Sequence, residues 1–136
     1  MRYYKLDGTD LSFEYPDYWN VSKEENVISL FDSSNGVGAL QFSIYQKNDK
    51  EPISLREALE EFVSMRHQHY EIVLMEKFAY CVCLDKKDTI WRYWLFQKSA
   101  NIIFASYNCP FDDGGKEDAI IDKIVMHAIK ESVRTR

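Results

Sequence analysis

Cysteine and histidine are the residues of this chain with the widest chemical scope. Cys81 and Cys83 stand two apart in an apolar stretch, and Cys109 follows a later one. The three histidines are His67, His69 and His127. Sulphur and nitrogen ligands suit zinc, but a structural zinc site uses four ligands with loop-like spacing. Cysteines that share one face of an apolar strand are more typical of core packing, so we expect three buried free thiols and no metal.

A catalytic interpretation of these residues lacks the necessary partners. Ser106 or Cys109 as a nucleophile would require a paired histidine and an orienting carboxylate, and no nucleophile elbow is present. His67 and His69 are two apart at the end of a predicted helix and do not share a helical face. We expect His127 at the rim of the buried stripe of the closing helix. The sequence therefore predicts no enzymatic activity and no cofactor.

The acidic run Asp112-Asp113-Gly114-Gly115 has the composition of a calcium-binding loop but not the spacing of an EF-hand. Glu117 and Asp118 follow it directly. Acidic side chains at the start of a helix interact favourably with the helix dipole. We therefore expect a solvated loop that leads into the closing helix.

Aromatic residues are concentrated on the predicted strand Thr89–Lys98. The alternating sets are Trp91, Tyr93 and Leu95 on one face, and Ile90, Arg92, Trp94 and Phe96 on the other. One set must pack in the core, which places large aromatic side chains on the second face of the sheet. Exposed aromatic residues beside an arginine are typical of binding hot spots. The candidate partner-binding residues are Tyr45, Trp91, Arg92, Tyr93 and Trp94; in the alternative, the N-terminal segment or the closing helix covers them.

Length and composition narrow the class of protein. The 136 residues predict a single domain over residues 1–136, large enough to fold without disulfides. Lysine and arginine are scattered over a chain of net charge −5, which argues against nucleic-acid binding. The longest apolar run, Ala79–Leu84, is too short to span a membrane, and the first ten residues lack the apolar core of a secretory signal. Together with an odd number of cysteines, these features favour a cytoplasmic protein.

The N-terminal part of the chain predicts a strand and then a hairpin. Strands are expected at Leu11–Tyr15, Asn26–Asp32 and Gly38–Gln46, where apolar residues alternate. Ser33–Gly36 is a turn cluster between the last two. Pro16 ends the first strand, and Trp19 is expected to fold back over the core. Residues 1–10 are expected to form an approach segment, and residues 21–25 are polar.

A charged loop, Lys47–Pro52, leads to the first predicted helix. Ser54 and Glu57 form a capping box, and the helix is expected to run to about Gln68. Its buried stripe is expected to contain Leu55, Ala58, Leu59, Phe62 and Met65. Further strands are expected at Ile72–Met75, Phe78–Leu84, Thr89–Lys98 and Ile102–Asn108, with a turn at Asp85–Asp88 and a closing helix over Lys116–Val133. The order β-β-β-α-β-β-β-β-α predicts an α+β fold with a mainly antiparallel twisted sheet of six to seven strands and two helices.

This order and one motif resemble the PsbP-like α/β/α sandwich superfamily. The motif is Phe13-Glu14-Tyr15-Pro16-Asp17-Tyr18-Trp19, which is similar to the F-x-Y-P-x-x-W opening of that group. The superfamily includes the photosystem extrinsic protein, a Ran-binding import factor and the bacterial DcrB-like proteins. The resemblance implies a protein-binding role without a common enzymatic activity. The chain departs from many DcrB-like proteins in having no lipoprotein signal, and it carries two tryptophans, Trp91 and Trp94, on one late strand.

Two functional classes follow from these observations. The first is a non-catalytic module of a bacterial cell that binds another protein, as a chaperone or adaptor or as an immunity-type inhibitor of a toxin. The second is a protein that holds a small hydrophobic ligand in a pocket between sheet and helix. An enclosed apolar pocket would favour the second class.

Overall fold

The computed structural model describes residues 1–47, 53–85 and 88–130, and two α-helices lie within these ranges. The strands are β1 (Arg2–Lys5), β2 (Ser12–Tyr15), β3 (Asn20–Glu24), β4 (Val27–Phe31), β5 (Ala39–Gln46), β6 (Val73–Leu74), β7 (Ala79–Leu84), β8 (Thr89–Lys98) and β9 (Asn101–Pro110). The helices are α1 (Leu55–Ser64) and α2 (Asp118–Lys130), with a short 3-10 helix, η1, at Phe111–Asp113. None of the described helices is long and apolar enough to span a membrane.

Seven strands form one sheet in the order β3-β4-β5-β9-β8-β7-β6, and every neighbouring pair is antiparallel. Strands β1 and β2 pair separately as a small antiparallel sheet. The predicted α+β class and mainly antiparallel sheet are confirmed. Strands β1 and β3 were not predicted, because both are short and largely exposed and so lack a periodic apolar face.

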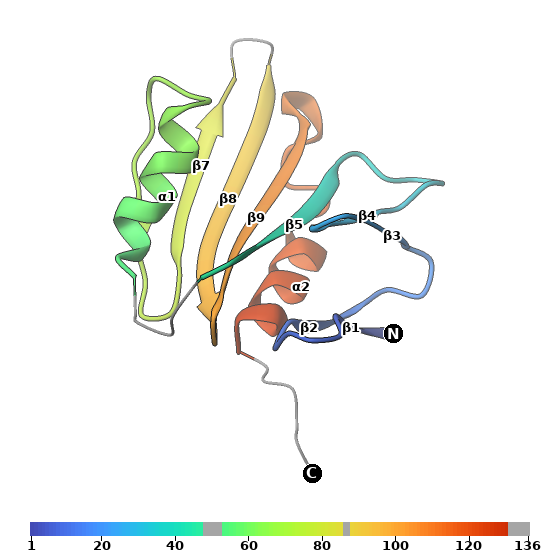
Figure 1. Ribbon diagram of the computed structural model, residues 1–136. Coiled ribbons are helices and arrows are strands. Elements are labelled where there is room, and N and C mark those ends of the chain that lie inside the picture. Colours follow the sequence, from blue (N-terminus) through green and yellow to red (C-terminus); the bar gives the residue numbers. More distant parts are fainter. Residues whose placement is uncertain (48–52, 86–87, 131–136) are drawn as a thin grey trace.

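The sheet lies between two layers (Figure 1). Helix α1 packs against β6, β7 and β8 on one face. Helix α2 and the β1–β2 hairpin cover β4, β5, β8 and β9 on the other face, and α2 contacts β2 directly. Because adjacent residues of a strand point to opposite faces, the long strand β8 contributes Tyr93 and Leu95 to the core beneath α1 and Trp94 and Phe96 to the core beneath α2.

The opening motif holds the hairpin to the sheet. Phe13 is fully buried, with its ring stacked on Phe42 of β5 at a centroid distance of 4.9 Å and on Tyr4 of β1 at 5.3 Å. Strand β2 ends at Tyr15, directly before Pro16, and Trp19 is buried in the same core. The prediction that Trp19 folds back over the core is therefore confirmed.

Helix α1 begins where predicted and ends early. The Ser54 hydroxyl accepts a hydrogen bond from the Glu57 N–H at 3.3 Å, as an N-cap should. The helix ends at Ser64 instead of about Gln68, because the Arg66 N–H turns back to the Val63 carbonyl and tightens the last turn. The predicted burial of Met65 is wrong: this residue is the C-cap and is 84% exposed, while Leu59 and Val63 are buried.

Helix α2 begins at Asp118, two residues later than expected. Its buried stripe contains Ile121, Ile124, Val125, Ala128 and Ile129. The predicted end of this helix at Val133, residues 48–52 of the predicted loop and residues 86–87 of the predicted turn lie outside the described residues.

Replacing Phe13 by alanine tests the attachment of the hairpin. The variant Phe13→Ala should lower the free energy of unfolding by about 3–5 kcal/mol, because a fully buried ring is removed from a packed aromatic stack. Urea denaturation followed by fluorescence measures the change. In the control, Tyr18→Ala at an exposed position of the same motif, stability should stay within about 0.5 kcal/mol. Equal losses in both variants would contradict this role of Phe13.

Candidate protein-binding groove

Rows of cross-strand neighbours on the α2 side of the sheet pass from the core to the surface. One row contains Ile28, Phe42, Ala105, Trp94, Tyr80 and Val73. Its first four members are buried, Tyr80 is half-buried, and Val73 is 43% exposed. A second row runs from Leu40 through Tyr107 and Arg92 to Val82, which is 50% exposed. The cover provided by α2 therefore stops short of β6 and β7.

The uncovered part of the opposite face has a different character. On the α1 side, Ser22, Ser29 and Gln41 form one exposed or half-buried row across β3, β4 and β5. Gln41 donates a side-chain hydrogen bond to the Ser29 hydroxyl at 3.1 Å. Phe31 and Tyr45 are exposed on the same side, so the open α1-side surface mixes polar and apolar residues, whereas the open α2-side rows end in the apolar residues Val73 and Val82.

Three adjoining hollows follow this apolar part between α2 and the strands, and together they form what we call the α2 groove. The first, of about 410 Å³, is lined by Met75, Glu76, Lys77, Phe78, Met126, Ile129 and Lys130. The second, of about 230 Å³, shares Met75, Phe78 and Met126 and adds Val73, Tyr80, Arg92, Trp94 and Asp122. The third, of about 390 Å³, shares Tyr80 and Arg92 and adds Val82, Ile90, Tyr107, Cys109, Phe111, Gly114, Gly115 and Asp118. Phe111 stands on its rim and is 53% exposed.

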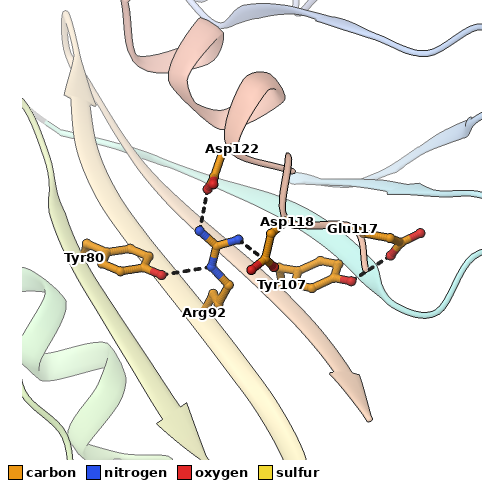
Figure 2. A network of polar contacts seen from close by, with 6 residues as sticks. All are labelled: Tyr80, Arg92, Tyr107, Glu117, Asp118 and Asp122. Carbon is orange, nitrogen blue, oxygen red and sulfur yellow. Dashed lines mark hydrogen bonds and ion pairs between the residues drawn. The ribbon is translucent and has the colours of Figure 1, made fainter. Parts of the chain in front are cut away.

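A network around Arg92 ties α2 to the floor of the groove. Figure 2 shows Tyr80, Asp118 and Asp122 pointing at the guanidinium of Arg92. Arg92 donates to the Tyr80 hydroxyl at 2.9 Å, to Asp118 at 3.3 Å and, through its second terminal nitrogen, to Asp122. Asp118 and Asp122 are four residues apart, so they project from the same face of α2. Strand β8 and the first turns of α2 are thereby joined by charge-assisted hydrogen bonds.

The Arg92 charge is stabilised although the residue is buried. Burial opposes the charged form, but the hydrogen bonds to Asp122 and Tyr80 outweigh it, and the pKa of Arg92 is raised. The guanidinium also lies over the rings of Trp94, at 4.7 Å from the centroid, and Tyr80, at 5.5 Å. Such cation–π contacts favour a cation in this position. Arg92 therefore acts as a fixed element of the groove wall.

Tyr107 and Glu117 form a second polar contact beside the groove. The Tyr107 hydroxyl donates to the buried Glu117 carboxylate at 2.7 Å (Figure 2). Burial and this hydrogen bond raise the pKa of Tyr107. The contact attaches the segment before α2 to β9, and Gly114 in that segment lies so close to Ile90 that an added Cβ would approach the Ile90 Cδ1 to 2.6 Å.

The predicted partner-binding residues do not form one surface. Tyr93 and Trp94 are each 1% exposed, in different cores, so the expectation that one of these aromatic faces lies open is wrong for them. The alternative is confirmed for Trp94, which lies in the core beneath α2; Tyr93 lies beneath α1. Trp91 is half-buried on the α1 side, and Tyr45 is 40% exposed beside Phe62 of α1. Arg92 is buried but borders the groove.

The exposed apolar residues of the groove were missed by sequence reasoning. They are Val73, Met75, Val82 and Phe111. The sequence of Ala79–Leu84 does indicate this exposed apolar surface. The segment is apolar at every position, although its strand lies next to the terminal strand of the sheet. Strand β7 therefore presents apolar side chains to both faces, and α1 covers only one of them.

The cysteines and histidines are divided between the two cores. Cys81 and Cys83 are buried beneath α1, with their sulphur atoms 3.6 Å apart, and Cys109 is buried on the α2 side. The prediction of buried free thiols is confirmed. No group of three or more residues with metal-ligand side chains occurs within the described part of the chain.

The histidines serve local contacts. His67 is hydrogen-bonded through Nε2 to the Tyr93 hydroxyl at 2.7 Å, and burial lowers the pKa of His67. His127 Nδ1 accepts from the Glu14 N–H at 2.9 Å, so it helps hold α2 to the hairpin. His69 is exposed. In the acidic loop, Asp113 pairs with Lys116 at 2.6 Å.

Comparison with known proteins supports the architecture and names no function. No protein-family model matches the chain, and a search of curated proteins finds no match. Among solved structures, PsbP (CyanoP) from Synechocystis sp. PCC 6803 is similar with a TM-score of 0.65 and 11% identity, over 93% of this chain and 89% of that protein. This chain has a PsbP-like fold.

A second solved structure agrees with this assignment. A protein of Bacteroides thetaiotaomicron VPI-5482 is similar with a TM-score of 0.61 and 15% identity over 86% of this chain, and the chain spans 43% of that protein's length. The resemblance predicted from the opening motif and the order of elements is thus confirmed as a PsbP-like fold.

The thiols give a test of the cores. Burial and the neighbouring Cys81 raise the pKa of Cys83 to about 12 from an ordinary value of 9.0. At pH 8 we expect the folded protein to react with Ellman's reagent at least ~100-fold more slowly than the urea-unfolded chain, because the thiolate is the reactive form.

The raised pKa of Cys83 also predicts how stability depends on pH. The unfolded chain loses the Cys83 thiol proton at lower pH than the folded protein does, so the free energy of unfolding should fall as pH rises from 9 toward 12. A Cys83→Ala variant should lose part of this slope; an unchanged slope would contradict the raised pKa.

The Tyr107–Glu117 contact can be tested by removing its donor. The variant Tyr107→Phe should lose about 1–3 kcal/mol of stability, because the buried Glu117 carboxylate is left without this hydrogen bond. Urea denaturation measures the loss. The matched variant Glu117→Gln keeps an acceptor for the Tyr107 hydroxyl and should lose less. The interpretation fails when Tyr107→Phe is as stable as the parent.

Proposed function

We propose that this domain is a non-catalytic module that binds another protein through the α2 groove. One observation carries the proposal: on the α2 side, exposed apolar side chains line three adjoining hollows, namely Val73, Met75, Val82 and Phe111. Contiguous exposed apolar surface rimmed by charged residues is characteristic of protein-interaction sites. Val73, Val82 and Phe111 are all about half exposed along it.

The form of the groove favours a protein over a small ligand. Sites for small molecules usually enclose most of the ligand surface. Here the apolar side chains of Val82 and Phe111 stand at the surface, and the space is divided into hollows of about 230 to 410 Å³ that follow one helix. A small hydrophobic ligand is the alternative, because the two larger hollows, of about 410 and 390 Å³, fall within the usual volume range of ligand pockets.

The groove also offers little for catalysis. Arg92, its buried charged group, is already held by Asp118 and Asp122. Burial raises the pKa of the Cys109 thiol and so disfavours the nucleophilic thiolate. These features support a role in binding without turnover.

Three free cysteines support a reducing compartment such as the bacterial cytoplasm. Two roles fit a non-catalytic protein that binds another protein in this compartment. One is a chaperone or adaptor, and the other is an immunity-type inhibitor of a toxin. The identity of the captured partner separates these two roles.

Site-specific cross-linking tests the proposal. A photo-reactive phenylalanine analogue placed at Val82 or Phe111 should cross-link one defined protein in cells of the native host, because both positions border the groove. The control position is Leu74, which is also exposed and apolar but pairs with Ala79 on the α1 side.

A Val82→Asp substitution should weaken the interaction at least ~10-fold while stability stays within about 0.5 kcal/mol.

Equal cross-linking from Leu74 and the groove positions would contradict the proposal. So would native mass spectrometry that finds a bound apolar small molecule which Val82→Asp releases, because that result assigns the groove to the ligand class.

A further inference from the structure

We infer that the α2 groove accepts an amphipathic α-helix of the partner, and that this helix lies antiparallel to α2. The inference rests on the proposed function and adds the chemistry and direction of the bound segment.

The first support is the size of the open surface. Where β6 pairs with Ala79 and Tyr80, β6 and β7 together occupy about 10 Å across the sheet at the usual strand spacing, which is close to the diameter of a helix with its side chains. Toward Val82 the open sheet narrows to β7, and the hollow bordered by Phe111 continues the groove there. Helix α2 has 13 residues, so the groove beside it runs for about 20 Å at 1.5 Å per residue. A partner helix of three to four turns matches both dimensions.

The second support is the other face of the same strands. Helix α1 already covers β6, β7 and β8 there, with Leu59 and Val63 in one core with Ala79 and Cys81. Apolar sheet surface is stably buried by a helix laid along it. A helix on the α2 side would complete the same arrangement over Tyr80 and Val82.

The third support is the charge at the two ends of the groove. Among the described residues that line the groove, Asp118 and Asp122 share the cation Arg92 at the end where α2 begins, and both carboxylates are half exposed, which leaves one net negative charge on this lining. At the end where α2 finishes, the described lining contains Lys77, Lys130 and Glu76, which leaves one net positive charge. A complementary segment is therefore basic at the Asp118 end and acidic at the Lys130 end.

These charges set the direction of the partner helix. Acidic side chains are favourable in the first turn of a helix and basic side chains in the last turn. A helix that places its acidic first turn near Lys130 and its basic last turn near Asp118 runs opposite to α2. The bound segment thus has an acidic start, one apolar stripe and a basic end.

Peptide selection tests the inference with a defined probe. A phage-displayed library of random 14-residue peptides is selected on the purified domain, and clones that also bind Val82→Asp are removed. The peptides that remain should carry apolar residues at positions i, i+3 or i+4, and i+7, after an acidic start and before a basic end. The control Leu74→Asp should bind them as the parent does.

Orientation is measured on a selected peptide. A spin label at its N-terminus should broaden the amide signals around Lys130 more strongly than those around Asp118. Reversing the charges by Lys77→Glu and Lys130→Glu should weaken binding at least ~10-fold. The double variant leaves the Arg92 network intact, so the stability of the domain serves as its control.

Three results would overturn the inference. Selected peptides with strict apolar alternation would indicate strand pairing at the β7 edge, broadening around Asp118 would indicate the parallel direction, and the absence of peptides that depend on Val82 would exclude a peptide site in the groove. When cross-linking from Val82 succeeds and the selected peptides alternate, the protein-binding function stands and only the helical partner is excluded.

Discussion

Arg92 of β8 joins the first turns of α2 to the sheet through directional, charge-assisted hydrogen bonds. Apolar burial is non-directional and would tolerate several positions of this helix over the sheet, whereas the guanidinium of Arg92 requires Asp118 and Asp122 at defined angles. Burial of the guanidinium makes those acids necessary, since an unpaired buried charge is strongly destabilising. With α2 held over β8 and β9, the α2 side of β6 and β7 is left open. The candidate binding surface is thus a consequence of the same interaction that closes the core.

Much of the fold could be predicted from the sequence because the central strands carry clear strand patterns. In Gly38–Gln46, large apolar side chains recur at every second position, and Thr89–Lys98 is a run of aromatic and aliphatic residues interrupted by Arg92. The edge strand β3, with sequence NVSKE, has no buried face and therefore carries no such pattern. The end of α1 was misplaced because Met65 is a good helix former, whereas the backbone closes the helix with hydrogen bonds from the Arg66 and His67 N–H groups to the Val63 carbonyl.

The candidate site could be predicted only in part. The sequence places Arg92 among aromatic residues on the correct strand, and that residue does border the groove. Alternation separates the two faces of β8, but it does not say which helix covers each face or how far the cover extends. That outcome depends on contacts between residues distant in the chain, such as Arg92 with Asp122 and Phe13 with Phe42. The exposure of Val82 therefore could not be predicted from the pattern of its strand alone.

The short length of β6 has a further consequence for the protein in the cell. Among the described residues, β6 pairs only with Ala79 and Tyr80, so the outer edge of β7 has no paired strand at Val82 and Leu84, and both side chains are exposed. An exposed apolar edge of this kind is a template for aggregation. The free chain is therefore expected to self-associate as its concentration rises, unless something covers this edge.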